Sequence, residues 1–296
     1  GLEPVLHAAI HSGLESLTEK LLENGDDIKT IGKDGSTALH ITSGSSILRS
    51  SSAERIARVL IEKGADVQAC DNDSKTPLHL ACGNRTWRES SAVAEILIVS
   101  GADINTLDKN QNSPLHAACQ TGSQATVELL IERGADMRAL NLGGLMPLDL
   151  ACQLPVPEMA GILTRRLTNL NMLDEGGRTL LHHACQYKNH QTAKILVERG
   201  AAIELPDNEG KSPLHFACEI RTDFSSSTRM VDCLVSKGAN INHRDNAGQT
   251  ALHHAARKRT DVVEGNSLEF YGTLGRHGIE VDAQDQTGKT ALLCAV

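Results

Sequence analysis

Histidine and cysteine recur as pairs along this chain of 296 residues. In each pair the cysteine follows the histidine by three residues, which places both side chains on one face of a helix. The pairs are His79 and Cys82, His116 and Cys119, His182 and Cys185, and His215 and Cys218. Both residue types bind zinc, but a zinc site needs about four ligands that converge on one point. Because the pairs are spread along the chain, the sequence predicts no metal site.

The chain lacks the short motifs on which common enzyme classes depend. It contains no nucleophile elbow, no Walker sequence and no dinucleotide-binding fingerprint. The glycine pairs Gly143-Gly144 and Gly176-Gly177 are interpreted as turns rather than as phosphate-binding loops. We therefore expect a protein that has no catalytic residues and needs no cofactor.

The histidines belong to a phrase that repeats through the whole chain. One copy reads Thr76-Pro77-Leu78-His79, and the next reads Ser113-Pro114-Leu115-His116. The leucine of this phrase recurs at positions 6, 39, 78, 115, 148, 181, 214, 252 and 292. Threonine or serine can cap a helix here, and proline suits the first helical turn. A second phrase, such as Leu130-Ile131-Glu132-Arg133-Gly134, keeps step with the first, and its glycine is suited to end a second helix.

Nine copies of one phrase, in register with a second, resemble the ankyrin-repeat family, whose unit is about 33 residues long. The resemblance covers essentially the whole chain. It implies an all-α solenoid of stacked helix–turn–helix units with projecting β-hairpin-like fingers. It also implies that the signature histidine makes structural hydrogen bonds near the base of the finger, and that the cysteine is a small buried residue. Because no repeat buries its apolar face without neighbours, we expect a single domain over residues 1–296.

Four intervals between repeats are longer than the others, and the extra residues fall between the first and second helices. These segments are 43–52, 83–91, 220–228 and 258–267, and their serine-rich, polar composition is typical of exposed loops. Two of them contain a large aromatic residue, Trp87 and Phe224. Each ring either folds back over a neighbouring helix or is an exposed anchor for a partner, a role in which tryptophan is common.

The fifth repeat departs most from the pattern. Asp149 stands in place of the signature histidine, and Leu167 in place of the glycine that ends the second helix. Its finger, residues 142–146, is apolar, and two prolines lie in residues 154–159. Local strain that bends the stack and a hydrophobic contact surface are the two explanations. Because exposed apolar fingertips are costly without a use, we favour the contact surface.

The family resemblance also implies where a partner would bind, since partners of ankyrin proteins usually lie across the fingertips and the inner helices. The matching finger positions include Lys109, Leu142, Leu145, Arg178 and Lys211. The matching positions on the first helices are Gln120, Gln153, Gln186, Tyr187, Glu219 and Arg257. The three glutamines are either an amide ladder for an extended peptide backbone or simply favourable exposed helix residues. We expect a protein or peptide to bind over repeats four to eight, with Leu142, Leu145 and Tyr187 as apolar anchors.

Two further histidines, His183 and His254, directly follow a signature histidine and are expected to be exposed on the same face. They either contact a partner, respond to pH near ~6.5, or are simply solvated. The principal function predicted is that of a protein-interaction scaffold. The alternatives are a substrate-recruiting arm of a larger enzyme, a catalytic site in the fifth repeat beside His182 and His183, and a purely structural spacer.

Composition limits the remaining function classes. The formal net charge of -8 argues against general nucleic-acid binding. The apolar stretches are too short to insert into a membrane. The eight cysteines, without a visible secretory signal, are typical of a reducing compartment, so we expect the cytoplasm or the nucleus. The chain begins and ends inside a repeat, and we expect a monomeric fragment of a longer protein.

Overall fold

The computed structural model describes residues 4–25, 28–86, 91–153, 157–167, 169–219, 224–257 and 267–294. Residue contacts group the chain into two compact units, residues 1–151 and 152–296, and each unit is described by itself. The single domain expected over residues 1–296 stays a prediction. The helices of the first unit are α1 (Val5–His11), α2 (Glu15–Glu23), α3 (Ala38–Gly44), α4 (Ser50–Glu62), α5 (Pro77–Cys82), α6 (Ala92–Val99), α7 (Pro114–Thr121), α8 (Gln124–Glu132) and α9 (Pro147–Cys152), which ends at the boundary. Those of the second unit are α10 (Pro157–Arg166), α11 (Leu180–Gln186), α12 (His190–Glu198), α13 (Pro213–Cys218), α14 (Phe224–Val235), α15 (Ala251–Ala256), α16 (Ser267–Arg276) and α17 (Ala291–Cys294).

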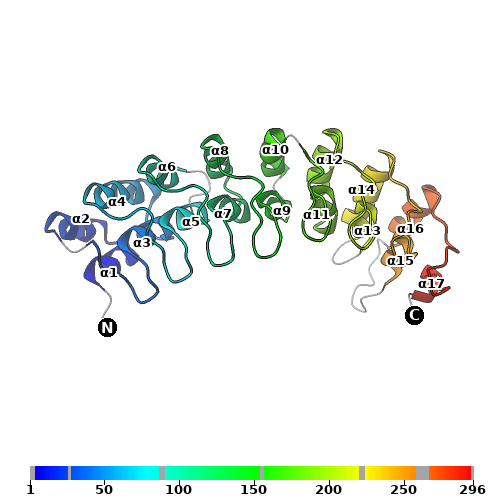
Figure 1. Ribbon diagram of the computed structural model, residues 1–296, viewed down its shortest axis with the longest axis horizontal. Coiled ribbons are helices and arrows are strands. Elements are labelled where there is room, and N and C mark those ends of the chain that lie inside the picture. The colour runs from blue at the N-terminus through cyan, green and yellow to red at the C-terminus, as the bar shows by residue number, and fades with distance from the viewer. Residues whose placement is uncertain are drawn as a thin grey trace. The chain divides into compact units, whose positions relative to one another are not determined.

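Each unit is a stack of helix pairs arranged in two rows (Figure 1). In the first unit α1, α3, α5 and α7 pack in succession, and α2, α4 and α6 form the second row. In the second unit α11, α13, α15 and α17 pack in succession beside the row of α10, α12, α14 and α16. We call the first helix of each pair, with α9, the inner helix and its companion the outer helix. The all-α stack predicted from the sequence is confirmed.

The repeated leucine lies in the core of the stack. Seven copies, from Leu6 to Leu214, are at most 2% exposed. Alanine and cysteine fill the space around them, and Ala118, Cys119, Ala184 and Cys185 are fully buried. Small side chains let neighbouring inner helices pack closely, which explains why the chain needs so few aromatic residues.

The fingers are hydrogen-bonded turns. In the described residues no strand forms, and the single isolated bridge joins Gln284 to Thr290. The carboxylate of Asp71 accepts the amides of Asp73, at 2.8 Å, and Lys75, at 2.9 Å, and the aspartates of later fingers make the same bonds. The amide of Asn72 also donates to the carbonyl of Asp34 at 2.8 Å, which ties one finger to the one before it. The fingers are therefore rigid without forming β-hairpins.

Two of the long intervals contain more helix than the sequence predicts. α14 begins at Phe224 and α4 at Ser50, so residues 224–228 and 50–52 belong to outer helices rather than to loops. Residues 87–90, 220–223 and 258–266 lie outside the described residues. Where the structure describes the chain, no helix is both long enough and apolar enough to cross a membrane.

Candidate functional site

The signature histidine caps the start of six inner helices, α3, α5, α7, α11, α13 and α15. Nδ1 of His79 accepts the backbone amide of Thr76 at 3.1 Å, and Nε2 lies 3.0 Å from the carbonyl of Asn112 in the next finger. Because that carbonyl can only accept, Nε2 carries the proton. The same pair of bonds occurs at His40, His116, His182, His215 and His253. The structural interpretation of these histidines is confirmed.

Burial makes the same residues poor catalysts. Desolvation lowers the pKa of His182 and of His215 to about 4, so both rings are neutral at physiological pH. Desolvation also raises the pKa of the Cys218 thiol to about 12 and that of Cys185 further still, so neither is a thiolate nucleophile. The histidine–cysteine pairs therefore stabilise the helices and the core.

His183 and His254 are not exposed, contrary to prediction. Each is 3% exposed. Nε2 of His183 lies 2.9 Å from the carboxylate of Asp174, and Nε2 of His254 lies 2.8 Å from that of Asp245. The finger folds back onto its own inner helix, so this helix position faces the aspartate at the base of the finger. These buried rings cannot contact a partner directly, and they hold the aspartate at the base of the finger in position.

His215, Asp245 and His254 place one nitrogen or oxygen each within 4.8 Å of one another, as metal ligands would. The hydrogen bonds of His215 argue against that use. Nδ1 accepts the amide of Ser212 at 3.1 Å, and Nε2 donates to the carbonyl of Gln249 at 3.2 Å. A metal would need a lone pair that the fold already occupies. We interpret the group as a structural network.

Arg178 and Lys211 lie over the ring of Phe216. The guanidinium carbon is 4.9 Å and the ammonium nitrogen 5.8 Å from the centroid of this buried ring, distances at which a cation is attracted to an aromatic face. Lys211 also pairs with Glu209 at 2.8 Å and approaches Glu219 at 4.0 Å. The side chains of Arg178, Lys211 and Glu219 are only 31%, 16% and 25% exposed. These three predicted contact residues therefore form a half-buried cluster.

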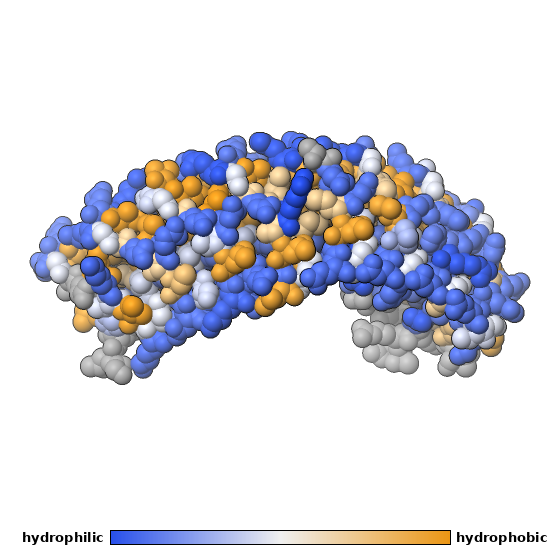
Figure 2. Space-filling view, in the orientation of Figure 1, coloured by the Kyte–Doolittle hydropathy of each residue, from blue (hydrophilic) through white to orange (hydrophobic). Residues whose placement is uncertain are grey.

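The remaining predicted contact residues are mostly exposed. Leu142 is 62% and Tyr187 39% exposed. Lys109, Gln120, Gln153 and Arg257 are exposed, whereas Leu145 and Gln186 are half-buried. Gln120 belongs to the first unit and Gln153 and Gln186 to the second, so the glutamine ladder stays a prediction. Figure 2 shows hydrophobic patches between the hydrophilic residues on the surface of the first unit.

Of the two aromatic residues in the long intervals, Trp87 lies outside the described residues. Phe224, the first residue of α14, packs against α16. Its ring centroid lies 5.8 Å from that of Phe270 and 6.4 Å from that of Tyr271. This arrangement agrees with a ring that folds back over a neighbouring helix.

The finger of the fifth repeat is built regularly despite its unusual sequence. Asn141 replaces the finger aspartate, and its side-chain oxygen accepts the amides of Gly143, at 2.9 Å, and Leu145, at 3.0 Å. Asp149 replaces the histidine, and its carboxylate accepts the amide of Met146 at 2.7 Å. Because these bonds match those of the other fingers, the finger itself is not distorted. It holds Leu142 exposed, Leu145 half-buried and Met146 buried.

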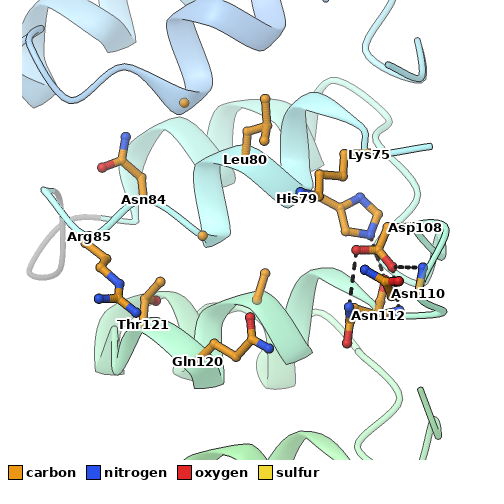
Figure 3. A pocket seen from close by; sticks show the side chains of 13 residues that line it. Lys75, His79, Leu80, Asn84, Arg85, Asp108, Asn110, Asn112, Gln120 and Thr121 are labelled. Atoms are coloured by element: carbon orange, nitrogen blue, oxygen red, sulfur yellow. Dashed lines mark hydrogen bonds between the residues drawn. The ribbon is translucent and has the colours of Figure 1, made fainter. Parts of the chain in front are cut away.

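A pocket of about 410 Å³ lies on the inner side of α5 and α7 in the first unit (Figure 3). Leu80 and Ala117 form its apolar floor. Gly44 and Gly83 border it, and both stand at the inner-helix position that Gln120 occupies in the next repeat. The two repeats therefore have no side chain at a position where later repeats have one. Its remaining lining is polar: Lys75, His79, Asn84, Arg85, Asp108, Asn110, Asn112, Gln120 and Thr121. Gln120 and the finger residues Asn110 and Asn112 match positions at which we expected a partner to bind, but we did not predict the other residues as a site, although the glycines at this position were a usable signal.

Known proteins resemble the chain in sequence and in structure. A family model described as ankyrin repeats in three copies matches residues 6–106, 86–165 and 157–223, and one described as ankyrin repeats in many copies matches residues 220–262. No curated protein matches the chain.

Solved ankyrin structures match most of the chain. The ankyrin-repeat domain of human ASB11 is 25% identical, covers 82% of this chain and 98% of its own length, and superposes with a TM-score of 0.67. The ankyrin-repeat domain of Bcl-3, described as a unique member of the IkappaB protein family, is 27% identical, covers 79% and 99%, and gives a TM-score of 0.62. Domains of this kind are generally protein-binding modules and typically non-catalytic. The chain belongs to the ankyrin-repeat family.

Proposed function

We propose that the chain binds another protein, or a peptide segment of one, through its fingers and inner helices. The observation that carries the proposal is a difference between two kinds of residue position, those that recur in most repeats and those that vary. The side chains that recur in most repeats are buried or hydrogen-bonded within the stack, as His79 and Asp108 are. Those that differ between repeats, such as Leu142 and Tyr187, are exposed. A rigid stack with exposed positions that vary suits recognition.

Each unit contributes its own residues to this function. In the first unit they are Lys109, Gln120, Leu142 and Leu145, and in the second Gln153, Arg178, Gln186, Tyr187, Lys211, Glu219 and Arg257. Leu142 and Tyr187 have the largest apolar area to bury against a partner, and tyrosine is frequent among residues that dominate binding energy. Arg178 and Lys211 lie over Phe216, Arg178 also pairs with Asp207, and Lys211 approaches Glu219, so these residues offer charges at low entropic cost.

The test is partner capture with matched variants. The immobilised chain captures proteins from native extract, and each captured protein is then measured for affinity in purified form. The variant Leu142→Ala, Leu145→Ala, Tyr187→Ala should weaken binding by about tenfold or more, as expected when anchors of an interface are truncated. The control variant Leu17→Ala, Val99→Ala removes side chains that are 41% and 71% exposed on the outer helices α2 and α6. Loss with the control and retention with the triple variant would show that the proposed surface is wrong.

A further inference from the structure

The pocket of Figure 3 contains two cations without an acidic partner. Lys75 and Arg85 both line it, and neither side chain makes an ion pair or hydrogen bond with any described residue. Some other cations of the first unit are paired, as Arg133 is with Glu95 at 2.8 Å and Arg55 with Glu19 at 2.6 Å. Figure 3 shows Lys75 and Arg85 at opposite ends of the pocket, with Leu80 between them. The pocket therefore has a positive group at each end.

The other titratable groups of the pocket do not neutralise these cations. Burial lowers the pKa of His79, so the ring is neutral. Asp108 is 8% exposed, and its carboxylate accepts the amides of Asn110 and Asn112 at 2.8 Å each and the side-chain amide of Asn112 at 3.3 Å. The finger amides occupy its carboxylate, which is buried and therefore little exposed to the pocket. The accessible charge of the pocket is that of Lys75 and Arg85.

Hydrogen bonds fix the backbone from which both cations extend. The amide of Lys75 donates to Asp71 at 2.9 Å, and its carbonyl lies 2.9 Å from Nε2 of His40. Arg85 follows Asn84, which is 7% exposed and whose side chain donates to the carbonyl of Ser45 at 2.8 Å. Little backbone entropy remains to be lost when an anion binds. The backbone of the site is already in place before a ligand binds.

The surface between the cations suits a peptide rather than a small anion. Leu80 and Ala117 provide an apolar floor, and Gln120 and Asn110 are exposed amides beside it. Amide side chains can both donate to and accept from a peptide backbone. The pocket is open because Gly44 and Gly83 have no side chains, and a Cβ at Gly83 would lie 3.8 Å from Cβ of Ala117.

We propose that this pocket binds an acidic segment of a partner protein, with carboxylates paired to Lys75 and Arg85 and small side chains over Leu80. The inference rests on the proposed protein-binding function and names the chemistry of one part of it. The chain as a whole carries a formal net charge of -8, so long-range electrostatics does not attract an acidic segment and the local pairing at Lys75 and Arg85 has to supply its affinity. Paired to carboxylates, arginine and lysine form charge-assisted hydrogen bonds, which are stronger than neutral ones.

Fluorescence anisotropy of the full chain with a labelled peptide of alternating glutamate and alanine tests the proposal. The matched probe replaces glutamate by glutamine. We expect the glutamate peptide to bind and the glutamine peptide to bind at least about tenfold more weakly. Added salt should weaken binding of the glutamate peptide only. Lys75→Glu with Arg85→Glu should abolish binding of the glutamate peptide. Ala117→Gln, which fills the pocket without a change of charge, should also weaken it.

The control variant is Arg58→Glu with Lys63→Glu. It changes the net charge by the same amount, and both side chains are exposed in α4 and at its end. Equal loss of binding in this variant would show general electrostatic attraction and overturn the proposal. Stronger binding of a single-stranded oligonucleotide through Lys75 and Arg85 would assign the pocket to nucleic acid instead.

The proposed function and the pocket can fail separately. If the captured partner is lost with the Leu142, Leu145 and Tyr187 variant while the glutamate peptide does not bind the unaltered chain, the pocket assignment is wrong and the proposed function stands. If the glutamate peptide binds as expected but no protein depends on Leu142, Leu145 or Tyr187, the surface of the proposed function is wrong instead.

Discussion

At the scale of single residues, side chains capable of chemistry are used to build the stack. His182 shows this clearly, because Nδ1 accepts the amide of Thr179 at 2.9 Å and Nε2 lies 3.0 Å from the carbonyl of Lys211. Protonation of the ring at Nδ1 would place two donors against each other. The neutral form that suits the fold is also the form that burial favours.

This arrangement predicts that stability falls as the pH is lowered. The pKa of His182 and of His215 is about 4 in the folded chain, below the usual ~6.5, so between these values only the unfolded chain binds protons. The free energy of unfolding should decrease by about 2 kcal/mol for each of these histidines between about pH 7.5 and pH 5. Urea unfolding at both pH values measures the difference.

A variant at one of these histidines provides the control. His182→Gln removes one of the two groups, so the difference between the two pH values should be smaller by about 2 kcal/mol, whatever the stability of the variant at neutral pH. A free energy of unfolding that is independent of pH in this range would contradict the assignment of neutral, buried histidines.

The roles of individual residues were only partly predictable from the sequence. The signature histidines could be assigned because their phrase recurs in register with a helix start. His183 and His254 were assigned wrongly, because their burial depends on carboxylates nine residues earlier in the chain. That contact is created by the finger as it folds back, and helical periodicity carries no signal for it.

At the scale of elements, most inner helices begin after a threonine or serine that caps them, and the side-chain oxygen of one residue fixes each finger. The replacements in the fifth repeat show which chemistry matters. Asn141 and Asp149 differ from the residues of the other repeats, yet each supplies the oxygen that the backbone amides need. An acceptor in the right place is therefore sufficient. Phe224 as the start of α14 was not predictable, because the polar run around it is equally typical of a loop.

The connection between fingers predicts a difference between two glycines that both have a positive φ. Gly64 has φ +88° and open space where a Cβ would lie, whereas a Cβ at Gly210, with φ +77°, would lie 2.7 Å from the backbone nitrogen of Asn246 in the next finger. We expect Gly64→Ala to cost about 1 kcal/mol through backbone strain, and Gly210→Ala a further ~1–3 kcal/mol through steric overlap. Chemical denaturation of the two variants measures both values. Equal losses would argue against close finger-to-finger packing.

At the scale of the whole molecule, sequence periodicity was enough to predict the all-α stack, because similar residues for starting and ending helices recur from repeat to repeat. The pocket of the first unit was harder to predict, since it arises from neighbouring repeats that both have glycine where Gln120 stands in the next. A stack of this kind offers recognition surface at every exposed position that varies. We therefore expect its partner to be selected by local differences such as Leu142, Tyr187 and the cations Lys75 and Arg85.

The most direct test of the binding surface is photo-crosslinking to the captured partner. A photoreactive benzoylphenylalanine replaces one exposed residue at a time, either Leu142 or Tyr187 on the proposed surface, or Leu17 or Val99 on the outer helices. We predict crosslinks to the partner from the first two positions and none from the last two. Crosslinks from the outer helices alone would contradict the central claim that fingers and inner helices bind the partner.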